Sequence, residues 1–159
     1  MVEISNHSFL SNTFYTTHAD LLCRSYERCI GQPLIPYEST SAESIDTLFA
    51  APFALVSHGT ETDPIFNFGN QTALALFELP WEQFTRLPSR KSAEPMNREE
   101  RQRLLERVTQ HEYINDYSGI RISASGKRFL IESATVWNLV DHFGHYRGQA
   151  AVFEHWLFL

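Results

Sequence analysis

The sequence lacks the features that mark several common classes of protein. It has two cysteines, Cys23 and Cys29, and their spacing within an apparently helical stretch gives neither a CxxC pair nor a disulfide framework. The N-terminus has no basic start followed by an apolar run, so it does not resemble a signal peptide. No apolar run approaches the length of a membrane span. These absences predict a cytoplasmic protein with reduced thiols and no membrane partner.

Positive charge and catalytic motifs are also sparse. The formal net charge of −6 argues against a general affinity for nucleic acid or anionic membranes. The sequence has no GxSxG, P-loop, HExxH or GxGxxG motif, so we expect no enzyme activity. Asp116 and Tyr117 could do acid–base work beside a pocket, but no base-orienting partner accompanies them. The alternative left open is a small cavity enzyme, an isomerase or hydrolase that acts on an apolar metabolite.

What the sequence does contain is typical of one globular domain with an aromatic interior. Apolar residues make up 43% of the 159 residues and charged residues 20%, and twelve phenylalanines dominate the aromatic content. The order of elements predicts an α+β fold with a helix over 13–31, a connector over 32–44 and a core over 45–157. Within the core we expect two short strands, several short helices, one longer helix and a three-stranded antiparallel meander. We take 1–159 as a single domain.

The longer helix is predicted over 98–111, with a defined start. Asn97 is a good N-cap, and Glu100 three residues later could return the hydrogen bond as in a capping box. The apolar stripe of this helix consists of Leu104, Leu105 and Val108.

The stretch GKRFLIESATVWNLVDHFGHYRGQAAVFEHW, over 126–156, reads as two extended runs joined by a glycine-containing turn. It lacks the apolar–polar alternation of a sheet with one face in water. A sheet that is covered on both faces does not need such alternation. We therefore expect other parts of the chain to cover both sides of this hairpin.

Four segments carry a resemblance to a known family. The runs SRKSAE, YSGIRIS, GKRFLIESATVWNL and GQAAVFEHW resemble the MEKHLA family, a module related to PAS domains that occurs alone in bacteria and algae and at the C-terminus of plant class III homeodomain-leucine zipper regulators. The similarity covers nearly the whole chain, including LLCRSYERCIGQPL near the N-terminus. It implies a five-stranded antiparallel sheet with the helices between Gly69 and Glu112 on one face. The N-terminal helix would lie on the other face.

The same resemblance implies a ligand site between the sheet and its helices, where PAS domains bind small molecules, haem or flavin. If Phe129 points inward, alternate residues of its strand up to Trp137 share that face, and Ala150 and Val152 face the same way on the last strand. The predicted pocket residues are Phe68, Trp81, Arg90, Leu105, Tyr117, Ile131, Ser133, Thr135, Trp137 and Ala150. The alternative is a filled core, in which the small side chains make room for Phe66, Phe68, Phe77, Trp81 and Leu105.

The resemblance to PAS domains also bears on which cofactor the pocket could hold. Photoactive flavin-binding relatives carry a reactive cysteine on the short helices, and none is present here, so a cysteinyl-flavin adduct is excluded. The places of their flavin-reading Asn and Gln fall on Ile131 and Ala150, which leaves only non-covalent flavin open. A haem ligand is not expected, because His111 lies at the very end of the long helix and would act as a C-terminal cap. A small organic molecule is the expected class of ligand.

No metal site is predicted. The cluster of Asp141, His142 and His145 falls in a hairpin turn, where such residues are usually solvated, and no third firm ligand accompanies the HxxH pair. Arg90 and Glu94 have the spacing of an ion pair on a helical turn, which could shape a pocket wall or fix a loop.

The function expected from these observations is that of a sensor. We expect a PAS-like module that binds a small molecule or reports a redox state and signals through a protein partner or a homodimer. The N-terminal helix and the outer face of the sheet would form the contact surface, with Gln149, Ala151 and Phe153 pointing outward.

Overall fold

The computed structural model describes residues 8–36 and 41–159, and from residue 44 onward it describes the side chains of the second range as well. The middle of the predicted connector therefore lies outside the described residues. The N-terminal part contains η1 (Ser8–Ser11), α1 (Thr13–Ile30) and α2 (Ser41–Ala50). The first predicted helix is confirmed. Asn12 caps α1 by accepting a hydrogen bond from the Phe14 amide, and Gly31 ends the helix with a φ of 81°.

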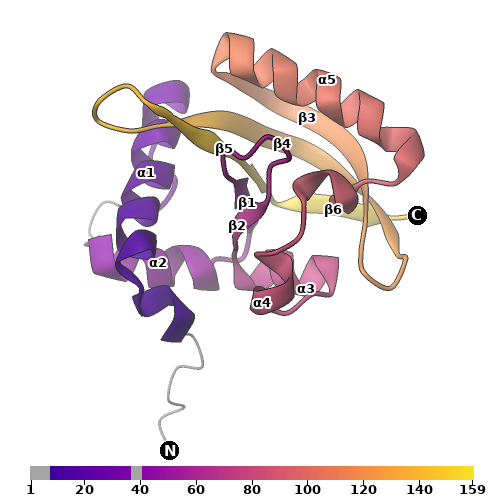
Figure 1. Cartoon of the computed structure of the whole chain (residues 1–159), viewed down its shortest axis with the longest axis horizontal. Coiled ribbons are helices and arrows are strands. Elements are labelled where there is room, and N and C mark those ends of the chain that lie inside the picture. The colour runs from indigo at the N-terminus through magenta and orange to yellow at the C-terminus, as the bar shows by residue number, and fades with distance from the viewer. Residues whose placement is uncertain (1–7, 37–40) are drawn as a thin grey trace, which may run out of the picture.

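The sheet is antiparallel throughout, with the strand order β2-β1-β5-β4-β3 (Figure 1). A last short strand, β6, continues beyond β5 and pairs with the first half of β4. The fold is therefore α+β and PAS-like, as predicted from the sequence. The strands are β1 (Ala54–His58), β2 (Phe66–Gly69), β3 (Tyr113–Ile122), β4 (Arg128–Val140), β5 (Tyr146–Phe153) and β6 (His155–Phe158).

The segment between β2 and β3 forms the predicted group of helices. Its elements are α3 (Gln71–Phe77), α4 (Trp81–Phe84), η2 (Ser89–Ser92) and α5 (Pro95–His111). The predicted start of α5 is wrong, because the N-cap is Glu94 and Asn97 lies inside the first turn. Pro95 explains the earlier start, since its fixed φ suits the first helical position and its missing N–H is one that no helix could satisfy.

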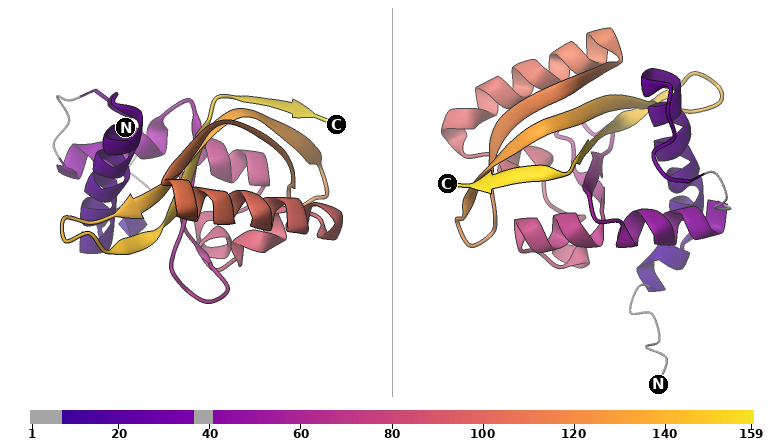
Figure 2. Two further views of the ribbon diagram at one scale, coloured as in Figure 1. Left: turned by 90° about the horizontal axis from the view of Figure 1, so that it is seen from above. Right: turned by 180° about the vertical axis from the view of Figure 1, so that it is seen from behind.

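Two hydrophobic clusters lie on opposite faces of the sheet. The inner cluster packs β-strand residues such as Phe129 and Phe153 against Phe77 of α3 and Leu104 of α5. The outer cluster packs Trp137 against α1 and α2. Both sides of the β4–β5 hairpin are thus covered, which accounts for the missing alternation in its sequence (Figures 1 and 2).

Strand β4 changes the face it presents at Ser133. This residue has a φ of 53°, so the strand is not continuously extended there. Phe129 and Ile131 before it belong to the inner cluster, and so do Ala134 and Val136 after it. The predicted inward face of Ser133, Thr135 and Trp137 is therefore wrong. Side chains alternate between the two faces only along an unbroken strand, and one left-handed residue shifts the alternation by one position.

Strand β5 also turns inward the face that was predicted to point outward. Ala151 pairs with Val136, and both line the inner side of the sheet, as does Phe153. Gln149 also faces α5, because its amide bonds the helix backbone. The expectation that Gln149, Ala151 and Phe153 point outward is therefore wrong. Every helix in the described ranges is too short or too polar to span a lipid bilayer.

Candidate ligand-binding site

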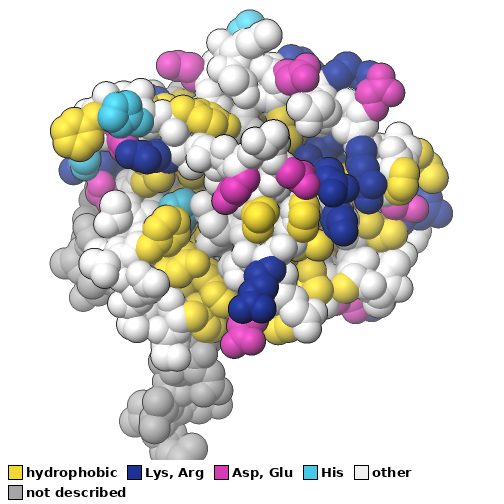
Figure 3. All heavy atoms as spheres, in the orientation of Figure 1, with side chains coloured by type: hydrophobic (Ala, Val, Ile, Leu, Met, Phe, Trp, Pro, Cys, Tyr) yellow, Lys and Arg dark blue, Asp and Glu magenta, His cyan; other side chains and the backbone are white. Residues whose placement is uncertain are grey.

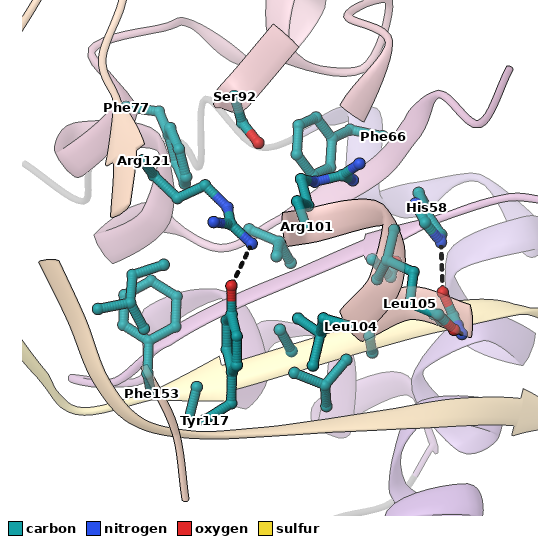
Figure 4. Close-up of a pocket in the computed structure, with 18 residues that line it drawn as sticks. His58, Phe66, Phe77, Ser92, Arg101, Leu104, Leu105, Tyr117, Arg121 and Phe153 are labelled. Atoms are coloured by element: carbon teal, nitrogen blue, oxygen red, sulfur yellow. Dashed lines mark hydrogen bonds between the residues drawn. The ribbon is translucent and has the colours of Figure 1, made fainter. Parts of the chain in front are cut away.

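A cavity of about 70 Å³ lies between the inner face of the sheet and α5 (Figure 4). Residues of all five main strands contribute to its wall, together with α3, η2 and α5. Most of these side chains are apolar, and the polar ones come from different elements. The lining residues are Val56, Ser57, His58, Phe66, Phe77, Ser92, Arg101, Leu104, Leu105, Tyr117, Arg121, Ile131, Ala134, Val136, Gln149, Ala150, Ala151 and Phe153.

Two arginines bring positive charge into this wall. Arg101 of α5 and Arg121 of β3 are each only 7% exposed. Arg101 donates from Nη2 to Ser89 Oγ at 2.7 Å, and Arg121 donates from Nη2 to the Tyr117 hydroxyl at 3.2 Å. Burial, and secondly the charge of Arg121, lower the pKa of Arg101 to about 10. Arg101 therefore remains a cation at neutral pH.

A hydrogen-bonded chain leads from Arg101 into the sheet. His58 Nδ1 lies 2.9 Å from Ser89 Oγ, and His58 Nε2 lies 3.2 Å from Gln149 Oε1. Burial, followed by the charge of Arg101, lowers the pKa of His58 to about 4. His58 is therefore a neutral, fully engaged side chain near pH 7.

Two amides of the sheet hold α5 in place. Gln149 Nε2 donates to the Leu105 carbonyl, to Thr109 Oγ1 and to Asn138 Oδ1, each at 3.1 Å. Asn138 Nδ2 donates to the Val108 carbonyl at 3.0 Å. The alignment from sequence placed the flavin-reading positions on Ile131 and Ala150 and missed this inward amide pair. Because both amides already bond each other and α5, their role here is to hold the helix against the sheet.

The structure brings together four of the ten predicted pocket residues, namely Leu105, Tyr117, Ile131 and Ala150. Three others, Phe68, Trp81 and Trp137, belong to the outer cluster under α1 and α2. Thr135 is half-buried, Ser133 is exposed, and neither lines the cavity. Whether any of the ten binds a ligand stays a prediction.

Six polar lining residues were missed from the sequence, and two of them, Arg101 and Arg121, could have been recognised from their spacing. Arg101 lies on the apolar stripe of α5, three and four residues before Leu104 and Leu105. Arg121 shares a strand face with Tyr117, four residues before it. A charged side chain in such a position points into the core unless the pattern breaks. The other four, Ser57, His58, Ser92 and Gln149, had no comparable pattern.

Arg90 lies outside the cavity and does not make its predicted pair. Its Nε donates to the two carboxylate oxygens of Asp63 at 3.1 and 3.2 Å. Glu94 lies 3.5 Å from Arg128 instead. The predicted Arg90–Glu94 pair is wrong because the 3₁₀ turn η2 ends at Ser92, so no helical turn spans the two residues. Figure 3 shows basic and acidic side chains interspersed over the face that carries α5.

The side chains considered for flavin and haem chemistry lie elsewhere. Cys23 and Cys29 are on α1, and neither lines the cavity. Burial, with the charges of Asp20 and Glu27, raises the pKa of the Cys23 thiol to about 11. His111 is exposed at the last position of α5.

The Asp141 turn is held together by its own hydrogen bonds. Asp141 accepts from the amides of Phe143 and His145 at 2.9 Å and from Arg147 Nε at 2.8 Å. These donors, the His145 amide first, lower the pKa of Asp141 to about 2. His142 Nε2 lies 3.7 Å from Oδ2 of Asp20 on α1. No three His, Cys, Asp or Glu side chains in the described ranges are grouped to hold a metal ion.

The fold is shared with solved sensory domains at low sequence identity. The PAS domain of a protein from Colwellia psychrerythraea is 14% identical, with a TM-score of 0.59 over 67% of this chain and 88% of that chain. A light-oxygen-voltage domain described with a flavin analogue is 13% identical, with a TM-score of 0.58 over 72% of this chain and 83% of that chain. A PAS domain from a two-component sensor histidine kinase is 18% identical, with a TM-score of 0.54 over 72% and 91%.

Comparison of the sequence itself gives a more specific result. Among curated proteins none matches it. The sequence model of one family, described as the MEKHLA domain, matches residues 16–158, which include every strand and the helices on both faces. With the PAS-like topology of the sheet and nearly complete coverage of the chain, this match shows that the chain belongs to the MEKHLA domain family.

Proposed function

We propose that this chain is a sensory module whose inner cavity binds a small molecule and whose state is passed to a protein partner. The observation that carries the proposal is the wall of the cavity. Apolar side chains such as Phe66 and Leu104 surround a few buried polar groups, including Arg101 and Tyr117, which come from separate elements. An apolar hollow with a few converging polar groups is the usual composition of a small-molecule site.

The sheet offers a route from the cavity to α1. Val136 and Ala151 pair on the cavity side, and the next residue of β4, Trp137, packs into the outer cluster. Ser25 of α1 accepts from the Val140 amide at 3.0 Å and donates to the Val140 carbonyl at 3.2 Å. A ligand that shifts β4 by even a fraction of an ångström would therefore move the anchor of α1.

The partner surface in this proposal is α1 with the neighbouring outer face of the sheet. Phe14 of α1 is exposed, and Thr135 and Val152, a cross-strand pair, are only half-buried. A second copy of the chain is the simplest occupant, because a symmetric contact needs no other component. Light scattering after size exclusion tests this part, and a strict monomer at high concentration would rule out the homodimer.

Ligand binding is tested with a pair of variants that place the same side chain on opposite faces of β4. Ala134→Leu puts three extra carbon atoms into the cavity wall, whereas Thr135→Leu adds bulk to the outer face. We would screen the wild type and both variants against small metabolites by thermal unfolding, and examine the purified protein by native mass spectrometry. The expected result is a compound that stabilises the wild type and Thr135→Leu but not Ala134→Leu.

Two results would contradict ligand binding in the cavity. If no compound raises the melting temperature of the wild type and no retained molecule appears in the mass spectrum, the cavity is only a gap in the packing of the core. If a compound stabilises all three proteins equally, it binds elsewhere. Either outcome would overturn the proposal.

A further inference from the structure

The two buried arginines of the cavity come from different elements and meet at one site. Arg101 projects from α5 and Arg121 from β3, and both line the same cavity as Tyr117 and Ser92. Figure 4 shows both guanidinium groups, with the Ser92 hydroxyl between them in this view. Fully buried arginines are uncommon in proteins unless a counter-charge accompanies them.

Neither arginine forms an ion pair within the described residues, although the charge of Asp63, which pairs with Arg90, also favours the charged form of Arg101. The hydrogen bonds of Arg101 and Arg121 go to the Ser89 hydroxyl, the Ile120 carbonyl and the Tyr117 hydroxyl, which are all neutral. Within residues 8–36 and 44–159, neither guanidinium forms an ion pair. Each guanidinium has five N–H donors, so several remain for another acceptor.

The exposed arginines of the same region behave differently. Arg90 lies 3.1 Å from Asp63, and Arg103 lies 3.0 Å from Glu99. Carboxylates are thus abundant around the cavity, yet they pair with surface cations. The carboxylate connected to the buried pair is Glu100, which reaches it only through the Tyr117 hydroxyl at 3.1 Å.

The electrostatic consequence is an excess of positive charge inside the cavity. Burial and the neighbouring charge of Arg121 both disfavour the charged form of Arg101, which lowers its pKa. Two like charges in a low-dielectric site are unfavourable unless an anion neutralises them. Arginine forks suit a carboxylate especially well, because two parallel N–H groups match its two oxygens.

The remainder of the cavity limits the rest of the ligand. Its other walls are apolar and include Phe66, Phe77, Leu104, Ile131 and Phe153. Its volume of about 70 Å³ is roughly half of the ~150 Å³ apolar cavity known to admit benzene. A carboxylate of about two to four carbon atoms is the size that this space favours.

We propose that the cavity binds a short-chain organic carboxylate, with its carboxylate group between Arg101 and Arg121 and its hydrocarbon part against the phenylalanines. This inference rests on the proposed function, because it names the chemical class of the ligand for the same site. An inorganic anion would satisfy the arginines but leave the apolar wall unused.

The test measures binding of sodium propionate and butyrate to the full chain by calorimetry, at constant ionic strength and pH 7.5. Propionamide and butyramide serve as neutral analogues of nearly equal shape, and phosphate serves as the inorganic anion. We expect the carboxylates to bind at least tenfold more tightly than the amides, since the charge-assisted bonds to both arginines are lost with the amide. Phosphate should bind more weakly than butyrate.

Three variants test whether the carboxylate binds at the two buried arginines. Arg121→Gln should weaken carboxylate binding about tenfold or more, while Arg90→Gln, the matched change outside the cavity, should leave it unchanged. Arg101→Lys keeps the charge but loses the fork, so it should bind with an intermediate affinity. Thermal unfolding of each variant without ligand shows that it is folded before binding is measured.

The outcomes separate this inference from the proposed function. If neutral compounds bind as tightly as carboxylates and Ala134→Leu blocks them, the cavity is a ligand site but not for anions. If phosphate binds more tightly than butyrate, the site is for an inorganic anion. If Arg90→Gln weakens carboxylate binding as much as Arg121→Gln, the anion binds outside the cavity. Each of these results would overturn the carboxylate proposal, and binding of nothing at all would overturn both proposals.

Discussion

Arg101 donates from Nη2 to the hydroxyl oxygen of Ser89 at 2.7 Å, and the same hydroxyl lies 2.9 Å from Nδ1 of His58. At the other side of the ring, the Gln149 carbonyl oxygen can only accept, so His58 carries a proton on Nε2 and donates to it. Because burial keeps the ring neutral near pH 7, Nδ1 carries no proton and accepts from the Ser89 hydroxyl.

A second buried histidine is held in the same state. His18 of α1 lies 2.8 Å from Ser57 Oγ, and Ser57 in turn donates to Asn67. Burial lowers the pKa of His18 to about 4, as it does for His58. Since unfolded histidines have a pKa near 6.5, the unfolded chain binds more protons than the folded one between about pH 6.5 and 4. The two histidines therefore stabilise the fold fully above pH 6.5 and lose that contribution as the pH falls through this window.

The expected result is a loss of about 1.4 kcal/mol of unfolding free energy per pH unit for each histidine in the middle of that window. Urea denaturation at several values between pH 7.5 and 4.5 measures it. His58→Gln keeps a polar group of similar size and should reduce the slope by one histidine's share. His155→Gln, an exposed position, should leave the slope unchanged. Parallel curves for the wild type and His58→Gln would contradict this account.

Ser133 should tolerate glycine better than valine. Its side chain is exposed, so no packing is lost by substitution, and the effect comes from its φ of 53°. Glycine adopts this conformation freely, whereas a β-branched residue is strained in it. We expect Ser133→Gly to stay within about 1 kcal/mol of the wild type and Ser133→Val to lose roughly 1–3 kcal/mol. Thr135→Val on the extended part of β4 is the control, and equal unfolding free energies for the two valine variants would refute the argument.

The general plan of the fold could be predicted from local chemistry. Asn12 and Gly31 mark the ends of α1 with side-chain and backbone properties that need no tertiary context. The absence of alternation over 126–156 correctly indicated a sheet with two covered faces. Resemblance to the MEKHLA family supplied the five-stranded antiparallel sheet and the placement of helices on its two faces, which periodicity alone could not.

The cavity was predicted less well, because its wall depends on single backbone angles. One left-handed residue, Ser133, moved Trp137 to the outer face, and serine carries no sequence signal for such a conformation. Arg101 could have been recognised, since it lies on the apolar stripe of α5. That Arg101 forms no ion pair with any described residue could not be recognised in the same way, because it depends on how the whole chain packs.

Gly148 is expected to be far less replaceable than Gly144. Both have positive φ, 128° and 80°. A Cβ on Gly148 would lie 2.0 Å from the His58 carbonyl oxygen on β1, whereas a Cβ on Gly144 would meet nothing within 4 Å. Gly144→Ala should therefore cost about 1 kcal/mol, from backbone strain alone. Gly148→Ala should cost roughly 3 kcal/mol or more, because β1 and β5 must also separate. Similar unfolding free energies for the two variants would show that this strand contact can yield.

Asn70 and Asn12 both cap helices, but they should respond differently to aspartate. Within the part of the chain that the structure describes, the exposed Asn12 side chain makes one hydrogen bond, which it accepts from the Phe14 amide. Asp at that position can accept the same bond and adds negative charge at the N-terminus of α1, so Asn12→Asp should be neutral or stabilising by up to about 1 kcal/mol.

Asn70 is fully buried and uses both ends of its amide. Its Oδ1 accepts from the amides of Leu55 and Ala73, while its Nδ2 donates to the carbonyls of Leu48 and Phe53. Aspartate would keep the two accepted bonds but direct an oxygen at two carbonyl oxygens and bury a charge. We expect Asn70→Asp to lose about 3–5 kcal/mol. Chemical denaturation of both variants measures the contrast. It should shrink as the pH falls towards about 4, because burial raises the pKa of the new carboxyl in the folded Asn70→Asp variant, which is then protonated and can donate to one carbonyl again.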